Sequence, residues 1–194
     1  MKTNLVALFL ILAAALWRVA LVSVPALSNV APITALALCG AVYFRDWRWW
    51  LVPFAAITLS DLWIDHYYAT RFGYTWPFSE MLLRAACVAA AVGIGCLVAR
   101  RRTAFGLVAG MLGNAIVFYL VTNTGVWAHD AYYAKTLAGW CQALTVGHPQ
   151  FPPTLWFFRN TLLGDLLFTG FFATVMALGT VRARPAPLSA AHMN

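Results

Sequence analysis

Long apolar segments alternate with short polar ones along the whole chain. Most of the apolar segments approach the roughly 20 residues that a helix needs to cross the hydrocarbon core of a membrane, and the second is shorter. Several carry glycine and alanine, which suit close packing between helices in lipid. The pattern predicts an all-α polytopic membrane protein with six transmembrane helices. Their predicted bounds are Leu5–Val24, Ile33–Phe44, Leu51–Ile64, Ser79–Ala99, Ala104–Val126 and Trp156–Val181.

The first apolar segment also has the form of a signal peptide. Lys2 precedes it, and the small residues near Ala26–Ser28 resemble a cleavage site. Because the rest of the chain is itself embedded in a membrane, we expect this segment to be retained as the first helix. Residues 1–181 then form a single transmembrane domain. Residues 182–194, which are rich in Ala, Pro and Ser, are expected to be a disordered cytoplasmic tail.

Composition supports a membrane protein and argues against other classes. The chain is 62% hydrophobic and only 10% charged, with a mean hydropathy of +0.75, whereas soluble proteins are about a quarter charged. Its 194 residues carry a formal net charge of +7. The basic residues lie in short clusters between apolar segments, which is the orientation signal of membrane proteins. We therefore expect no nucleic-acid partner.

The basic clusters also predict the orientation of the chain. Six helices place both chain ends on one side of the membrane, and most of the basic residues fall on that side. The positive-inside rule then places both termini in the cytoplasm, and we expect the bacterial inner membrane. The loops at residues 25–31, 66–78 and 127–154 would face outward. The basic residues of the cytoplasmic side are Lys2, Arg45, Arg48, Arg100, Arg101, Arg102, Arg182 and Arg184.

An acidic residue occupies the last apolar segment, where lipid makes a charge costly. Asp165 lies about 13 Å along its predicted helix, close to the middle of a hydrocarbon core of roughly 30 Å. A carboxyl group at that depth needs a partner in the protein interior or in a wet cavity. Arg159 lies about 120° away around the same helix and is a poor partner. A donor from elsewhere is expected, and the candidates are Arg18, Asn29 and Asn123.

Polar groups also gather at the outer ends of other predicted helices. Arg18 lies about one turn from the outer end of the first helix, where it either snorkels to the interface or turns inward as the counter-ion of a carboxylate. Asn123 and Trp127 end the fifth helix, and an amide beside an aromatic wall suits a small-molecule site. Asn160 lies beside the helix face that carries Asp165. For Asp165, a purely structural buried hydrogen bond is the alternative to lining a substrate site.

Asp61 and Asp65 lie on one helix face, with His66 next in sequence. Together with His129 they form the one plausible metal-dependent site, since carboxylates and imidazoles are metal ligands. A polar cavity wall or an ordinary solvated helix end explains these residues more simply than a metal site does. No HExxH, GxSxG or phosphate-loop motif is present, so we expect no enzyme, no metal and no cofactor. The four cysteines lack metal-binding spacing, and only Cys141, in a loop, is a candidate reactive thiol.

Several segments together resemble a known family. They are residues 29–44, Ser60–Asp61, residues 122–127 and residues 160–166. In these segments the chain resembles an uncharacterised family of small bacterial six-helix membrane proteins that are labelled as transport proteins. The resemblance covers about Val24–Gly179. In size and layout that family is similar to the S components of energy-coupling factor vitamin transporters.

The resemblance implies a membrane-embedded binder that captures a vitamin-like small molecule at its outer face. It also implies docking on an energy-coupling transmembrane subunit with two ATPases. S components dock through an AxxxA pattern on the first helix; here the first helix has no AxxxA, and Ala31/Ala35 and Ala37/Ala41 have that spacing on the second. The residues expected to bind substrate are Arg18, Asn29, Asp61, Asn123, Trp127, Arg159, Asn160 and Asp165, with the aromatic side chains of Tyr74, Trp76 and Trp140 as a cover. The alternatives are the metal-dependent intramembrane enzyme and a structural or assembly protein.

Overall fold

The computed structural model describes residues 2–24, 30, 32–44, 46–73, 75 and 77–182. Within these ranges the regular elements are all helical, so the all-α fold class is confirmed. The α-helices are α1 (Lys2–Leu21), α2 (Ile33–Tyr43), α3 (Leu51–Phe72), α4 (Phe78–Ala99), α5 (Ala104–His129), α6 (Leu137–Leu144) and α7 (Thr154–Arg182), and a 3₁₀ helix, η2 (Trp47–Trp50), precedes α3. The predicted tail lies outside the described residues, apart from Arg182 at the end of α7.

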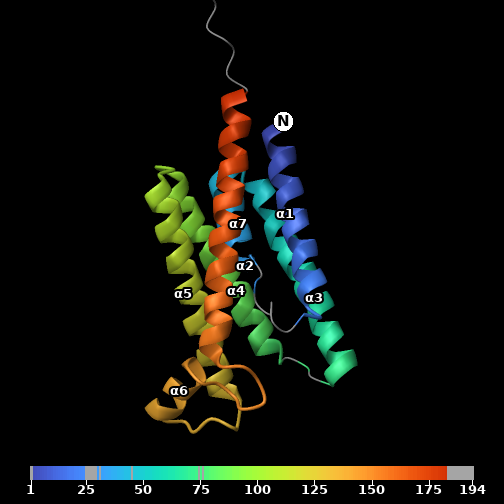
Figure 1. The fold of residues 1–194 in the computed structure, drawn as a ribbon, viewed down its shortest axis with the longest axis vertical. Coiled ribbons are helices and arrows are strands. Elements are labelled where there is room, and N and C mark those ends of the chain that lie inside the picture. Colours follow the sequence, from blue (N-terminus) through green and yellow to red (C-terminus); the bar gives the residue numbers. More distant parts are fainter. Residues whose placement is uncertain are drawn as a thin grey trace, which may run out of the picture.

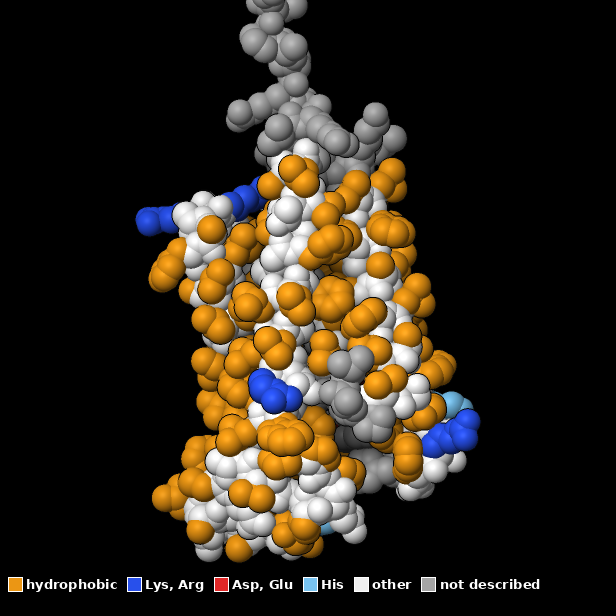
Figure 2. Space-filling view, in the orientation of Figure 1, with side chains coloured by type: hydrophobic (Ala, Val, Ile, Leu, Met, Phe, Trp, Pro, Cys, Tyr) orange, Lys and Arg blue, Asp and Glu red, His pale blue; other side chains and the backbone are white. Residues whose placement is uncertain are grey.

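Among the described residues, four helices are long and apolar enough to cross a membrane. They are α1 over Asn4–Leu21, α4, α5 and α7 over Thr154–Leu178. Large apolar side chains lie exposed on the outside of the bundle, and Phe105 is 83% exposed. Figure 2 shows these apolar side chains covering most of the visible face. An exposed apolar surface of this extent marks contact with lipid or another protein, which supports a membrane protein.

A helix lies at each of the six predicted positions, four of them long and apolar enough to cross a membrane, but two of the predicted loops are partly helical. The loop at residues 66–78 is helical up to Phe72, because α3 continues until Gly73 ends it with a φ of +66°. Thr70 supports the last turns by donating to the carbonyl oxygen of His66 at 2.9 Å. The loop at residues 127–154 contains α6, whose first turn is capped by the Thr136 side chain. Polar residues hid the end of α3, and α6 was missed because its 8 residues are far too few to cross a membrane.

The short helix α2 lies at the centre of the bundle. Each residue from Thr34 to Val42 is buried, as expected of a helix that is apolar all round. It packs most extensively against α4 and also contacts α7, α5, α3 and α1. Small residues permit this approach, because a Cβ at Gly95 would lie 2.7 Å from the Cβ of Ala41 and 2.8 Å from the carbonyl oxygen of Leu38. The prediction that the second helix packs closely is confirmed.

Basic residues gather at one end of the bundle. The start of α1 and the end of α7 share that end, and the α4–α5 turn also lies there (Figure 1). This turn carries Arg100, Arg101 and Arg102, all exposed, and the blue side chains at that end are visible in Figure 2. The end of α3 and the helix α6 lie at the opposite end (Figure 1).

Candidate functional site

The N-terminus of α2 receives its hydrogen-bond acceptor from a distant helix. Pro32 precedes α2 and supplies no side-chain cap. The backbone N–H of Ala35 donates to Asp165 Oδ1 at 3.2 Å, and the Thr34 hydroxyl donates to Asp165 Oδ2. Asp165 is fully buried and Thr34 is 2% exposed. The carboxyl group of α7 therefore takes the place of an N-cap for α2.

This contact is electrostatically favourable for both partners. The first N–H groups of a helix lack partners in the helix itself, and the N-terminus carries roughly half a positive charge. A carboxylate held there satisfies one of these donors, the N–H of Ala35, together with the hydroxyl of Thr34, and is itself stabilised inside the bundle. Asp165 thus fixes the start of α2 against the middle of α7.

The predicted donors to Asp165 were partly wrong. Arg18 and Asn123 bond elsewhere, and Asn29 lies outside the described residues. The exclusion of Arg159 is confirmed, since its guanidinium lies over the ring of Trp156, 5.4 Å from the centroid, and Nη2 donates to Asn160 Oδ1 at 3.4 Å. Sequence reasoning missed Thr34 because a threonine in an apolar helix gives no signal of its own.

Arg18 turns inward as the counter-ion of Asp61, so the interface-anchor alternative was wrong. Its Nη2 lies 2.5 Å from Asp61 Oδ1, and Nη1 donates to Ser60 Oγ at 2.6 Å. Arg18 is 7% exposed. The pair joins α1 to α3 and neutralises two charges that neither helix could bury alone.

A second ion pair joins α3 to α4. Arg84 Nη2 lies 2.7 Å from Asp65 Oδ2 and Nη1 lies 3.2 Å from Oδ1, a two-point contact between guanidinium and carboxylate. Sequence reasoning did not identify Arg84. The signal was available, since Arg84 is an ionisable residue inside an apolar segment, which by default indicates a buried partner or a functional site.

Asp61 and Arg84 meet at a small cavity between α3 and α4. The cavity has a volume of about 60 Å³, room for one or two water molecules at roughly 30 Å³ each. Elsewhere the backbones of α3 and α4 approach each other at few points. Each of the two ion pairs contributes one charged residue to the lining, Asp61 from the pair with Arg18 and Arg84 from the pair with Asp65. Its lining residues are Phe54, Ile57, Thr58, Asp61, Leu62, Met81, Arg84, Ala85 and Val88.

Asn123 and Trp127 bond within their own part of the chain. Asn123 Nδ2 donates to the carbonyl oxygen of Tyr119, one turn earlier on α5, at 2.8 Å. Trp127 Nε1 donates to the carbonyl oxygen of Ala134 at 2.9 Å, and Trp140 Nε1 donates to Thr124 Oγ1 at 2.9 Å. These bonds attach α6 and its flanking turns to the end of α5.

The predicted substrate-binding residues thus fall into three clusters rather than one cavity. Arg18 and Asp61 join α1 to α3, Asn160 and Asp165 are buried on α7, and Asn123 and Trp127 lie at the end of α5. Of this set, Asp61 lines the cavity between α3 and α4. Asn29, Tyr74 and Trp76, which were predicted to line or cover the ligand, lie outside the described residues.

The metal-dependent alternative gains no support from the geometry. Asp61 and Asp65 are each held by an arginine, His66 is exposed, and His129 Nδ1 lies 3.0 Å from its own helix at the Gly125 carbonyl oxygen. Among the described residues, His, Cys, Asp and Glu side chains form no group of three or more that could hold a metal ion.

Comparison with known proteins identifies a family but no activity. No curated protein and no solved structure matches the chain. A profile described as a family of unknown function, DUF6580, matches residues 1–187, nearly the whole length. The chain therefore belongs to the DUF6580 family.

Proposed function

We propose that the protein is a membrane transport protein that binds a vitamin-like small molecule from the outer face, in the manner of an S component. The observation that carries this proposal is the α3–α4 cavity, lined by a carboxylate and a guanidinium within the bundle. Charged groups inside a membrane are costly, and in membrane proteins they commonly mark the path or site of a polar ligand. The proposal assigns binding and uptake to the chain, not catalysis.

The present cavity corresponds to a closed state. Ligand sites usually measure roughly 300–1,000 Å³, so a volume of about 60 Å³ holds water but no vitamin-sized molecule. The backbones of α3 and α4 approach each other at few points, and the Asp65–Arg84 ion pair joins the two helices. In our proposal, α3 moves away from α4 when a ligand enters, and polar groups of the ligand replace contacts of this pair.

The arrangement of charge supports six membrane crossings with both termini in the cytoplasm of a bacterium. The three arginines of the α4–α5 turn lie toward the end that carries the start of α1 and the end of α7 (Figure 1). Green fluorescent protein fused to the C-terminus should then fluoresce, and alkaline phosphatase should be inactive there. Active phosphatase at the C-terminus would contradict this orientation.

We further propose an energy-coupling subunit with ATPases as the partner.

The binding proposal is tested by native mass spectrometry of the protein purified in mild detergent. We expect a small-molecule adduct on the wild-type chain that is lost in Asp61→Asn and Arg84→Gln, because both side chains line the cavity. Asp46→Asn is the matched control, since Asp46 is exposed and lies in the turn before η2. No adduct on the wild type, or equal adducts on all variants, would refute the proposal.

A structural or assembly role is the second candidate, and the complete burial of Asp165 favours it. In this case the ion pairs and the α2 cap hold helices together and bind nothing. The same spectra separate the two functions. A structural protein shows no adduct, while Arg84→Gln still lowers its thermal stability.

A further inference from the structure

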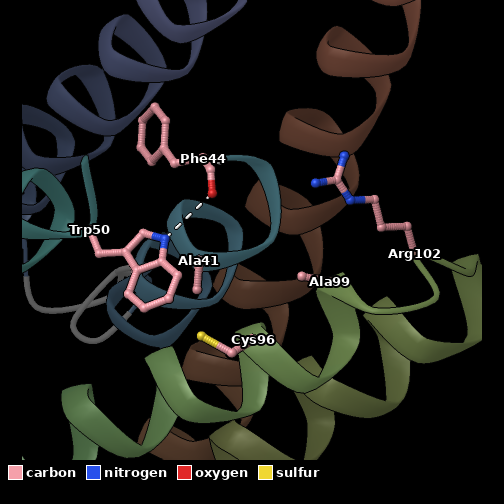
Figure 3. A pocket seen from close by; sticks show the side chains of 6 residues that line it. All are labelled: Ala41, Phe44, Trp50, Cys96, Ala99 and Arg102. Atoms are coloured by element: carbon pink, nitrogen blue, oxygen red, sulfur yellow. Dashed lines mark hydrogen bonds between the residues drawn. The ribbon is translucent and has the colours of Figure 1, made fainter. Parts of the chain in front are cut away.

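A second cavity opens at the basic end of the bundle, away from the α3–α4 cavity. It has a volume of about 330 Å³ and lies where α2, η2 and α4 end. Figure 3 shows Trp50 and Phe44 on one side, Arg102 on the other, and Cys96 and Ala99 of α4 between them. The lining residues are Ala41, Phe44, Trp50, Cys96, Ala99 and Arg102.

The walls of this cavity are held in place by packing and backbone bonds. Trp50 Nε1 donates to the carbonyl oxygen of Phe44 at 3.4 Å, and the ring of Phe44 stacks on that of Trp49 at 5.7 Å. The close approach of Gly95 to Ala41 keeps α2 and α4 together beside the cavity. The aromatic wall therefore exists before any ligand binds.

Arg102 brings a positive charge to this wall, and it makes no ion pair with a carboxylate of the described residues. Its φ of +44° is rare for a residue other than glycine, and its N–H donates to the carbonyl oxygen of Val98 at 2.9 Å. Within the described part of the chain, the ion pairs involve other arginines, namely Arg18 and Arg84. A guanidinium that is not engaged by a carboxylate is suited to a phosphate, which it can contact through two N–H groups.

The surroundings favour a lipid phosphate over a soluble one. Leu97, next to Cys96, is 60% exposed, and Phe105, one turn after Arg102, is 83% exposed. Acyl chains can lie on these side chains while the headgroup reaches the cavity. Tryptophan at the ends of membrane helices is typical of the headgroup level. Basic pockets between helix ends on the cytoplasmic side suit anionic headgroups.

We infer that this cavity binds the phosphate headgroup of an anionic phospholipid of the surrounding leaflet. Arg102 contacts the phosphate, Trp50 and Phe44 pack against the glycerol region, and Arg100 and Arg101 add to the positive potential. This site is independent of the transport proposal, because none of its lining residues belongs to the α3–α4 cavity.

Cys96 reports occupancy of the site, since its sulfur points into the cavity (Figure 3). In a Cys141→Ser background the exposed thiol is removed, while Cys39 and Cys87 are buried. We expect phosphatidylglycerol added to detergent micelles to slow the reaction of Cys96 with N-ethylmaleimide. Phosphatidylcholine and inorganic phosphate should leave the rate unchanged.

Arg102→Gln should weaken the effect of phosphatidylglycerol by roughly fivefold, the contribution of one basic residue near a membrane surface. Arg71→Gln is the control, because Arg71 is exposed at the far end of α3. Equal protection by phosphatidylcholine would overturn the inference. Protection by inorganic phosphate alone would indicate a soluble anion and overturn the lipid assignment.

A second measurement avoids dependence on thiol reactivity. Native mass spectra recorded with equal amounts of the two lipids should show one phosphatidylglycerol more on the wild type than on Arg102→Gln. The Arg71→Gln protein should match the wild type. Identical lipid counts on all three proteins would refute the site even if Cys96 reacts slowly in every condition.

Discussion

Replacement of Asp165 by alanine should destabilise the protein by removing the cap of α2. The substitution leaves the N–H of Ala35 and the hydroxyl of Thr34 without their acceptor in a buried site. Each buried donor without a partner costs about 1–3 kcal/mol. The Thr34 hydroxyl can turn toward a helix carbonyl, and loss of the buried carboxyl group removes its own desolvation cost. We therefore expect a net loss of about 2–4 kcal/mol in the free energy of unfolding.

Two measurements separate loss of the cap from a general defect. Unfolding in mixed micelles at increasing sodium dodecyl sulfate gives the change in free energy. Hydrogen exchange gives its location, since exchange should quicken in the first turn of α2 and not in α5. Asp165→Asn should lose about half as much, because its amide oxygen still accepts one of the two bonds.

Asn123→Ala is the matched control for the substitution of Asp165. The amide of Asn123 bonds to its own helix and is only partly buried, so its loss should cost about 1 kcal/mol or less. The reasoning is wrong if Asp165→Ala lies within about 0.5 kcal/mol of the wild type, the scatter expected of substitutions away from structural features. It is also wrong if Asn123→Ala costs as much as Asp165→Ala.

Two further predictions concern the contacts that α4 makes. Gly95→Ala should lower the melting temperature, because the added Cβ would meet the backbone of α2. Gly93→Ala is the control and should be neutral or slightly stabilising, since a Cβ there would have nothing within 4 Å. Equal melting temperatures of the two variants would contradict the close approach of α2 and α4. Asp65→Arg and Arg84→Asp should each lower the free energy of unfolding. An uncompensated buried charge costs about 3–5 kcal/mol, and the partial exposure of this pair should bring the loss below that range. The double exchange should restore most of the loss, and a double variant no more stable than either single one would show that the pair does not join α3 to α4.

The sequence by itself predicted the all-α fold, the approximate positions of six helices, and apolar segments long enough to cross a membrane, of which the structure has four among its described residues. These follow from hydropathy, which is a local property, since burial in lipid acts on each apolar segment separately. It also determined that Asp165 must have a partner, because the cost of a charge in lipid does not depend on the fold. The continuation of α3 was missed because its residues are largely polar, and α6 was missed because a helix of 8 residues is too short to register as a membrane span.

Only the tertiary structure decided which groups meet. Arg18 could reach water or a carboxylate, and the packing of α1 on α3 placed it beside Asp61. Asp165 received its donors from α2, a helix 130 residues away in sequence, because α2 starts inside the bundle with its first N–H groups exposed to α7. The pairing of Arg84 with Asp65 follows from the packing of α4 against α3. Pairings of this kind depend on helix rotation and depth, which no local pattern of residues determines.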